Sequence, residues 1–284
     1  MKIIFNKKRT LRELLSLLKY EVVLALKYIP KRLTAWWRKS PDFIIIGVMK
    51  GGTTSLYEYL DQHPDVQMSR EKEVNYFSMY YYRSKLFYKS FFSYKSENKM
   101  AGEASPFYFF HPQVPARIKR DLPGAKIILI LRNPVLRAYS QYNHIKGIDS
   151  AANFNEAVEM ESKRVTKEME EKATTKPYYA NKSYLSFSYF SKGLYFKQLS
   201  NWLKHYKKEE LLILKSEDLF ENPKKELKKM YQYLGLKEIY PSDLTPKNQR
   251  FYKGLSEKDY LRHKEFFRED AEQLKALLGN HFTW

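Results

Sequence analysis

The chain of 284 residues contains no cysteine and only six histidines. The absence of cysteine excludes disulfide bonds and thiolate metal sites, and the histidines lack the paired spacing of a structural zinc site. Long apolar runs are scarce at the N-terminus: charged side chains interrupt the leucine-rich segment 9–29 repeatedly, so no membrane span fits it. That segment also lacks the apolar stretch and the small-residue cleavage site of a signal peptide.

Acidic residues are outnumbered, because 51 Lys and Arg stand against 32 Asp and Glu, a formal net charge of +19. Residues 1–40 hold eleven Lys or Arg and two Glu, or +9, and the other 244 residues carry 40 minus 30, or +10. Such a surface attracts phosphate, sulfate, anionic lipid or polyanionic glycan. No recognisable nucleic-acid-binding module is present, so nucleic acid is not an expected partner.

The charge distribution predicts two parts, a basic amphipathic N-terminal arm at residues 1–40 and one folded domain at residues 41–284. The arm either rests on a membrane surface or docks as a helix on the protein itself or on a partner. Trp36 and Trp37 beside Arg38 favour an interface. We therefore expect a cytoplasmic protein whose arm can contact the membrane peripherally.

Apolar strand-like runs alternate with helix-like segments along the predicted domain. This alternation predicts an α/β fold with a central, mainly parallel sheet flanked by helices. Asn before Pro at 133–134 and again at 222–223 is typical of a helix start. The strands are expected at 43–47, 126–131 and 211–215, and the helices at 54–62, 112–121, 134–146, 153–172, 193–206, 223–234 and 256–278.

The segment 41–56 is the most informative in the chain. A buried strand, Phe43 to Ile46, runs into a turn with Gly51-Gly52 and then into a hydroxyl-rich helix start, Thr53-Thr54-Ser55. Such a turn presents unpaired backbone N–H groups at the positive end of a helix dipole, which suits a phosphate or sulfate ester. Lys50 adds a cation inside the loop.

The same loop argues against a nucleotide triphosphatase, while a nucleotide kinase, which would need magnesium, stays a rival. A Walker A loop has its lysine directly after the last glycine, whereas Lys50 precedes Gly51-Gly52. The apolar strand at 126–131 ends in Arg132, where a triphosphatase usually has an aspartate that helps to hold magnesium. A cation at that position favours a second anion over a metal, so no metal is expected.

The segment 131–144 supplies that second anion site. Arg132 sits at the carboxyl end of a predicted strand, where α/β sheets bind ligands, and Ser140 follows two helical turns later. An arginine fork and a hydroxyl could thus converge on a further phosphate. Two simpler interpretations stay open at this stage, since Arg137 could pair with an acidic neighbour and Ser140 could be a small packing residue.

Two anion motifs in this order resemble the sulfotransferase superfamily that uses 3′-phosphoadenosine 5′-phosphosulfate (PAPS). Over about residues 41–284 the sequence is similar to a bacterial-type member of the carbohydrate branch, the heparan-sulfate N- and O-sulfotransferases. The resemblance implies a P-loop-type three-layer fold and transfer of a sulfuryl group from PAPS to a carbohydrate hydroxyl or amine, with 3′-phosphoadenosine 5′-phosphate (PAP) as product and without metal. Further matching segments are Lys72-Glu73-Val74-Asn75-Tyr76-Phe77, Gly102-Glu103-Ala104-Ser105-Pro106-Phe107-Tyr108 and Leu122-Pro123-Gly124-Ala125-Lys126.

The resemblance also implies roles for individual residues. Arg132 and Ser140 would hold the 3′-phosphate, and the segment 247–255 would lie on the adenine side. The donor-binding set is Lys50, Gly51, Gly52, Thr53, Thr54, Ser55, Arg132, Ser140, Lys253 and Gly254.

Three residues would be catalytic by the same resemblance. Lys50 would stabilise the charge that develops on the leaving phosphate, and Glu73 would be the base that takes a proton from the acceptor. His144 matches a histidine near the acceptor site of the N-sulfotransferases. Glu71 is a nearby competitor for the role of base, and Glu73 could instead be a solvated loop residue.

The chain also departs from the heparan-sulfate pattern. Ala104 stands where a catalytic lysine is common, Asn75 stands where a histidine is frequent, and the C-terminal disulfide loop is missing. These changes leave the donor site intact and the acceptor open, so a glycolipid or a small molecule remains an alternative acceptor. A rival of another class is a non-catalytic, membrane-peripheral protein that binds anions.

Overall fold

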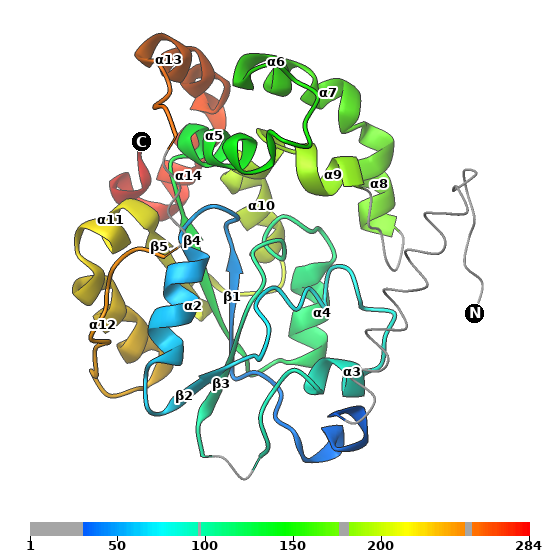
Figure 1. Cartoon of the computed structure of the whole chain (residues 1–284), viewed down its shortest axis with the longest axis vertical. Coiled ribbons are helices and arrows are strands. Elements are labelled where there is room, and N and C mark those ends of the chain that lie inside the picture. The colour runs from blue at the N-terminus through cyan, green and yellow to red at the C-terminus, as the bar shows by residue number, and fades with distance from the viewer. Residues whose placement is uncertain (1–30, 96–97, 176–181, 248–251) are drawn as a thin grey trace.

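The computed structural model describes residues 31–95, 98–175, 182–247 and 252–284. Five strands form one parallel sheet in the order β2-β3-β1-β4-β5. Their bounds are β1 Phe43–Gly47, β2 Val66–Met68, β3 Met100–Ala104, β4 Lys126–Leu131 and β5 Leu211–Lys215. β1 lies at the centre, so the loop that follows it opens at the middle of the carboxyl edge of the sheet (Figure 1).

Helices surround this sheet. The α-helices are α2 Thr53–Asp61, α3 Lys85–Lys89, α4 Val114–Asp121, α5 Pro134–Ile145, α6 Phe154–Glu159, α7 Glu161–Arg164, α8 Lys167–Thr175, α9 Lys182–Phe187, α10 Tyr195–Trp202, α11 Ser216–Glu221, α12 Pro223–Leu234, α13 Glu257–Phe266 and α14 Arg268–Leu278. The 3₁₀ turns are η1 Ala35–Trp37, η2 Ser191–Gly193, η3 Lys208–Glu210 and η4 Asn280–Phe282.

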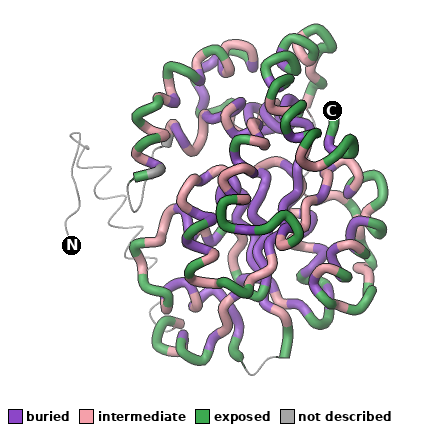
Figure 2. The backbone as a smooth tube through the Cα atoms, turned by 180° about the vertical axis from the view of Figure 1, so that it is seen from behind, coloured by how far each residue is buried: buried purple, intermediate pink, exposed green. Residues whose placement is uncertain are grey.

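The two faces of the sheet carry separate cores, because successive strand side chains point to opposite faces. Phe43 and Ile45 pack with α2, α11 and α12 on one face. Ile44 and Ile46 pack with α3, α4, α10 and α14 on the other face. Seen from behind, the strands form the buried centre of the molecule (Figure 2). This is the three-layer α/β arrangement that the sequence predicts.

A third cluster packs outside the sheet. It joins α5 and α6 with Tyr189, Phe190 and Phe267, and these helices lie beyond the carboxyl ends of the strands (Figure 1). Asn133 caps α5 by accepting a hydrogen bond from Leu136 N at 3.1 Å. Asn222 caps α12 in the same way through Lys225 N at 3.2 Å. Both predicted helix starts are therefore confirmed.

Two predicted helices are each broken in the structure. The segment 153–172 forms α6, α7 and the start of α8, because Glu161 turns inward to accept hydrogen bonds from the backbone of Phe190 and Ser191. The segment 256–278 divides at Phe267, whose ring is buried in the third cluster. The predicted strands at 43–47, 126–131 and 211–215 match β1, β4 and β5.

The predicted N-terminal helix at 9–29 lies outside the described residues, and the division into an arm at 1–40 and a domain at 41–284 stays a prediction. Across the ranges that the structure describes, none of the helices combines the length and the apolar character needed to cross a bilayer.

Candidate active site

A cleft of about 670 Å³ lies at the carboxyl ends of the strands. Every strand contributes through the segment that follows it, as expected for a parallel α/β sheet. The lining residues are Met49, Lys50, Gly52, Thr53 and Thr54 after β1, Lys72 and Glu73 after β2, Pro106 after β3, Arg132, Ser140 and His144 after β4, and Phe220, Lys247 and Tyr252 after β5.

The glycine loop turns tightly from β1 into α2. Gly52 has φ of 101° and Lys50 has φ of 68°, so both adopt the left-handed region, which costs a lysine more than a glycine. At Gly51 an added Cβ would lie 3.0 Å from the Val48 carbonyl oxygen and 3.1 Å from that of Ile130. Gly52, the N-cap of α2, makes no side-chain cap, and Gly52, Thr53 and Thr54 line the cleft, so the start of α2 offers its N–H groups there as an anion site.

Arg132 connects the two anion motifs. Its Nη1 donates a hydrogen bond to the Lys50 carbonyl oxygen at 2.8 Å. Its own carbonyl oxygen accepts one from the Tyr195 hydroxyl, also at 2.8 Å. The guanidinium is thereby held beside the glycine loop from the adjacent strand β4. The structure brings together the residues that the sequence placed about 80 positions apart.

Ser140 and His144 lie one turn apart on the face of α5 that lines the cleft. Ser140 is buried and His144 is exposed. Arg137, one turn before Ser140 on α5, is fully buried and donates to Gln141 Oε1 at 2.8 Å and to the Tyr189 carbonyl oxygen. Its partners are therefore an amide and a backbone carbonyl, and burial lowers the pKa of its guanidinium.

Glu73 projects from the loop after β2. Its side chain is 53% exposed and forms an ion pair with Lys72 Nζ at 2.9 Å. Glu73 and Asn75 both have positive φ, 60° and 52°. The neighbouring Glu71 does not line the cleft, so the geometry favours Glu73 as the carboxylate that meets a ligand there.

A buried carboxylate holds this loop in place. Glu103 is fully buried on β3 and accepts hydrogen bonds from the Tyr88 hydroxyl and, at 2.7 Å, from Ser105 Oγ. Ser105 Oγ in turn accepts from Asn75 N at 3.0 Å, and Glu73 N donates to the Ala104 carbonyl at 2.9 Å. Burial raises the pKa of Glu103, an effect opposed by these hydrogen bonds.

Four of the sequence-predicted residues do not line the cleft: Gly51, Ser55, Lys253 and Gly254. Ser55 is buried and its hydroxyl accepts from Lys247 N at 2.9 Å. The Lys253 carbonyl accepts from the Tyr139 hydroxyl at 2.6 Å, next to Ser140. Lys247 is thus held at α2 and Lys253 at α5.

Several cleft residues were not singled out from the sequence as site residues. Lys72 could have been found as the cation directly before Glu73, and Lys247 and Tyr252 fall within the segment expected on the adenine side. Met49, Pro106 and Phe220 are apolar and carry no local signal in the sequence.

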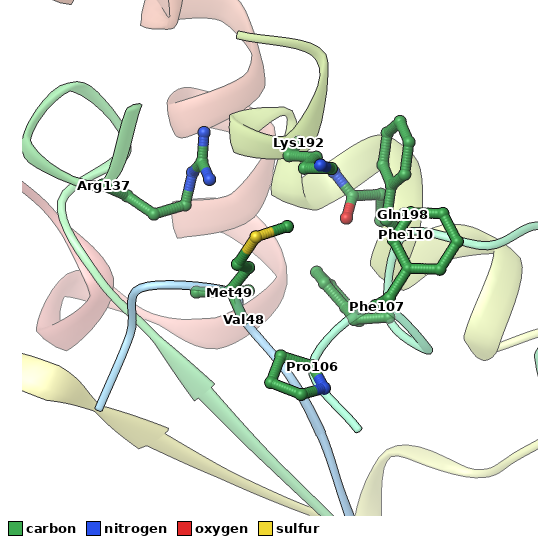
Figure 3. Close-up of a pocket in the computed structure, with 9 residues that line it drawn as sticks. Val48, Met49, Pro106, Phe107, Phe110, Arg137, Lys192 and Gln198 are labelled. Carbon is green, nitrogen blue, oxygen red and sulfur yellow. The ribbon is translucent and has the colours of Figure 1, made fainter. Parts of the chain in front are cut away.

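A smaller cavity of about 10 Å³ shares lining residues with the cleft, and Figure 3 shows the side chains around it. Met49 and Pro106 line both spaces, and Arg137, Lys192 and Gln198 supply the polar side of the small one. Burial and the nearby Arg137 lower the pKa of Lys192 to about 7. Arg137 Nε and Gln198 Oε1 have no partner among the residues that the structure describes, so this space suits one bound water molecule and is too small for a substrate.

The charges of the lining suit an anionic ligand. Among the described lining residues, four cations, Lys50, Lys72, Arg132 and Lys247, stand against one carboxylate, that of Glu73. A cluster of cations with helix N–H groups can stabilise negative charge on a leaving group, and a carboxylate close by can accept a proton.

The site can now be compared with known proteins. A family model described as a sulfotransferase domain matches residues 40–276. The chain is a member of the sulfotransferase family. The family assignment that the two anion motifs suggested is therefore confirmed.

Curated sulfotransferases are similar to this chain over most of its length. Membrane-associated sulfotransferase kil1 of Dictyostelium discoideum is 28% identical, with 86% of this chain and 66% of that protein covered. Heparan sulfate glucosamine 3-O-sulfotransferase 3A1 of Mus musculus is 33% identical, with 71% of this chain and 47% of that protein covered. The chain thus spans about half to two thirds of the length of these relatives.

A solved structure supports the fold of this sulfotransferase. The sulfotransferase from Alicyclobacillus acidocaldarius aligns with a TM-score of 0.68 at 26% identity, covering 84% of this chain and 96% of that one. The predicted fold class, a P-loop-like α/β layered domain, is confirmed by this match and by the parallel sheet.

Proposed function

We propose that this sulfotransferase moves a sulfuryl group from PAPS to a hydroxyl or amine of a carbohydrate acceptor. The observation that carries the proposal is the convergence of Lys50, Arg132 and Ser140 with Glu73 in one cleft. The likeness to heparan sulfate glucosamine 3-O-sulfotransferase 3A1 supports the acceptor class.

The cleft divides into two halves on this proposal. The donor half comprises Lys50, the loop 51–55, Arg132 and Ser140. The open N-terminus of α2 would receive the 5′-phosphosulfate, and Arg132 with Ser140 would receive the 3′-phosphate. Lys253 and Gly254 would lie on the adenine side, next to Tyr252. The acceptor half comprises Lys72, Glu73 and His144.

The chemistry is an in-line transfer without an enzyme-bound intermediate. The donor supplies an activated sulfur. Glu73 accepts the proton of the acceptor hydroxyl while the acceptor oxygen bonds to sulfur and the bond from sulfur to the bridging phosphate oxygen breaks. Lys50 and the α2 amides stabilise the charge left on that phosphate, and such donors are typically worth about 3–4 kcal/mol each. No step requires a metal ion.

A contact of the arm 1–40 with a membrane is part of the proposal, since the arm carries a net charge of +9 and the similar protein kil1 is named membrane-associated. The arm would hold a cytoplasmic enzyme peripherally at a bilayer.

The test is a transfer assay with ³⁵S-labelled PAPS and purified full-length protein over a panel of glycans, glycolipids and phenols, with EDTA present. We expect labelled glycan and a rate that EDTA does not change. If only glycolipids or only phenols were labelled, the proposed carbohydrate acceptor would be wrong and that class would take its place. No transfer to any acceptor, with PAP bound normally, would favour a non-catalytic anion-binding protein. Stronger binding of ATP than of PAP would favour a kinase.

A further inference from the structure

An apolar tip stands on the molecule at the start of the described chain. Leu33, Trp36 and Trp37 are 73%, 68% and 64% exposed. Exposed indoles are costly in water, and two adjacent ones with a leucine form a patch that calls for an apolar or interfacial partner. We name these three residues the tryptophan tip.

The tip is held on a rigid base. Ala35 between its members is fully buried, and Lys39 N donates to the Ser93 carbonyl at 3.0 Å. The Arg38 guanidinium is buried, donates to the Phe92 carbonyl at 2.8 Å and lies 4.3 Å from the centre of the Tyr94 ring. Because the base is fixed, the indoles are presented to a partner without a large ordering cost.

Cations surround this base. Arg32, Lys85, Lys95 and Lys99 are exposed. η1 packs against α3, which carries Lys85 and Lys89. Burial lowers the pKa of Lys89, and the neighbouring charges of Lys95 and Lys85 lower it further. Like charges are therefore crowded around Lys89, although Lys85 also pairs with Asp121 Oδ1 at 3.2 Å, and an anionic partner would relieve the cost of that crowding.

The tip and the cleft lie at opposite ends of the sheet. η1 precedes the amino end of β1, whereas the cleft is lined by segments that follow the carboxyl ends of the strands. Lys126 N, at the amino end of β4, donates to the Asp42 carbonyl at 2.9 Å, which fixes this end of both strands. In Figure 1 the blue segment with η1 lies at the bottom beside α3, and α5 and α6 lie at the top.

We propose that the tryptophan tip and the nearby lysines, Lys85, Lys89, Lys95 and Lys99, dock on an anionic lipid bilayer, with the cleft opening away from that bilayer. Interfacial indoles flanked by cations match a surface that is apolar below and negatively charged above. A soluble polyanion would satisfy the lysines and leave the indoles in water. The orientation rests on the proposed function of the cleft. It implies that the acceptor is reached from the aqueous side and is not a lipid headgroup of the same bilayer.

The first experiment measures binding of the full-length protein to vesicles of phosphatidylcholine with 30% phosphatidylserine, without donor or acceptor, by co-sedimentation. We expect Trp36→Ala/Trp37→Ala to weaken vesicle binding about tenfold or more, and Lys89→Gln/Lys95→Gln to weaken it about tenfold in a salt-dependent manner. The matched control is Ile148→Ala/Leu261→Ala, since these side chains are 61% and 56% exposed elsewhere and should leave binding unchanged.

Three results would overturn the docking face. The first is that the double tryptophan variant binds vesicles as well as the wild type does. The second is that the wild type binds vesicles of pure phosphatidylcholine as well as vesicles that contain phosphatidylserine. Loss of a wild-type dimer in the same variant, seen by sedimentation velocity, would assign the tip to a second copy of the chain. None of these measurements involves sulfate transfer, so they are independent of the proposed activity.

The second experiment tests the orientation. Saturating vesicles should leave the rate on a soluble glycan acceptor within about twofold of the free enzyme, because the cleft stays open to water. Strong inhibition by vesicles, or faster transfer to a glycolipid in the bound vesicle than to the soluble glycan, would contradict it.

Discussion

The donor half of the cleft is assembled from two local motifs, whereas the acceptor half depends on a buried network on a neighbouring strand. Lys50 and Arg132 each follow a central strand and contact each other directly through the Lys50 carbonyl. Glu73 sits on a loop whose backbone is tied to Ser105, and Ser105 is tied to Glu103. The acceptor half can therefore change its ligand through exposed residues such as Glu73. The donor half is constrained more strongly, by its local sequence and by the contact between Lys50 and Arg132.

The largest effect is expected at the acceptor half. Glu73→Gln should lower the turnover number about a thousandfold, because the amide cannot accept the acceptor proton. The affinity for PAP, measured by calorimetry, should stay within about twofold of the wild type, because the residue lies outside the donor half. Equal losses of turnover and of PAP affinity would give Glu73 a structural role and erase the division into halves. Glu71→Gln is the matched control and should retain activity.

The next effect is expected in the donor half. Lys50→Ala should lower the turnover number by about 10²–10³ with an unchanged melting temperature, since it removes a cation from the site of the developing charge. Lys204→Ala, at an exposed lysine far from the cleft lining, is the control. An undiminished rate in Lys50→Ala would refute the assignment of Lys50.

Arg132 separates recognition of the 3′-phosphate from catalysis. Arg132→Lys should weaken PAP binding about 10–100-fold, because a fork of two donors becomes a point charge. Binding of adenosine 5′-phosphosulfate, which lacks the 3′-phosphate, should change much less. Equal weakening of both nucleotides would mean that Arg132 acts only by shaping the Lys50 loop.

The smallest effect is expected behind the acceptor half. Ser105→Ala removes the hydrogen bond to Glu103 and leaves Asn75 N without its acceptor. It should lower turnover about 5–10-fold and leave PAP affinity unchanged. Ser105→Thr keeps the hydroxyl and should restore most of the rate. Loss of PAP affinity in Ser105→Ala would show that the two halves are coupled.

The sequence predicted the elements around the glycine loop because their geometry is local. β1, the Gly51-Gly52 turn and the start of α2 are contiguous, and the Asn133 cap fixes how α5 begins. The apolar runs in the sequence also predicted the strands β1, β4 and β5. The strand β1, the glycine turn and the start of α2 thus followed from short-range patterns in the sequence.

The rest depended on contacts between distant residues. β2 has only three residues, and β3 contains Gly102 and Glu103 in place of a continuous apolar run. An added Cβ at Gly102 would lie 2.2 Å from the Phe43 ring, a tertiary constraint that no local pattern records. The inward turn of Glu161 that breaks the predicted helix is likewise a tertiary effect. The ion pair between Lys72 and Glu73 is seen in the folded loop, although the position of Lys72 directly before Glu73 was a signal in the sequence.

The buried Glu103 carboxylate has a consequence for how such sequences can diverge. Tyr88, Ser105 and the Asn75 backbone are satisfied together, so replacing one member leaves another polar group buried without a partner. Single substitutions in this group are therefore expected to be selected against, and only compensated double or triple replacements are expected to survive. The exposed residues of the acceptor half are not constrained in this way. They could therefore change to suit a new acceptor while the hydrogen-bonded group around Glu103 stays the same.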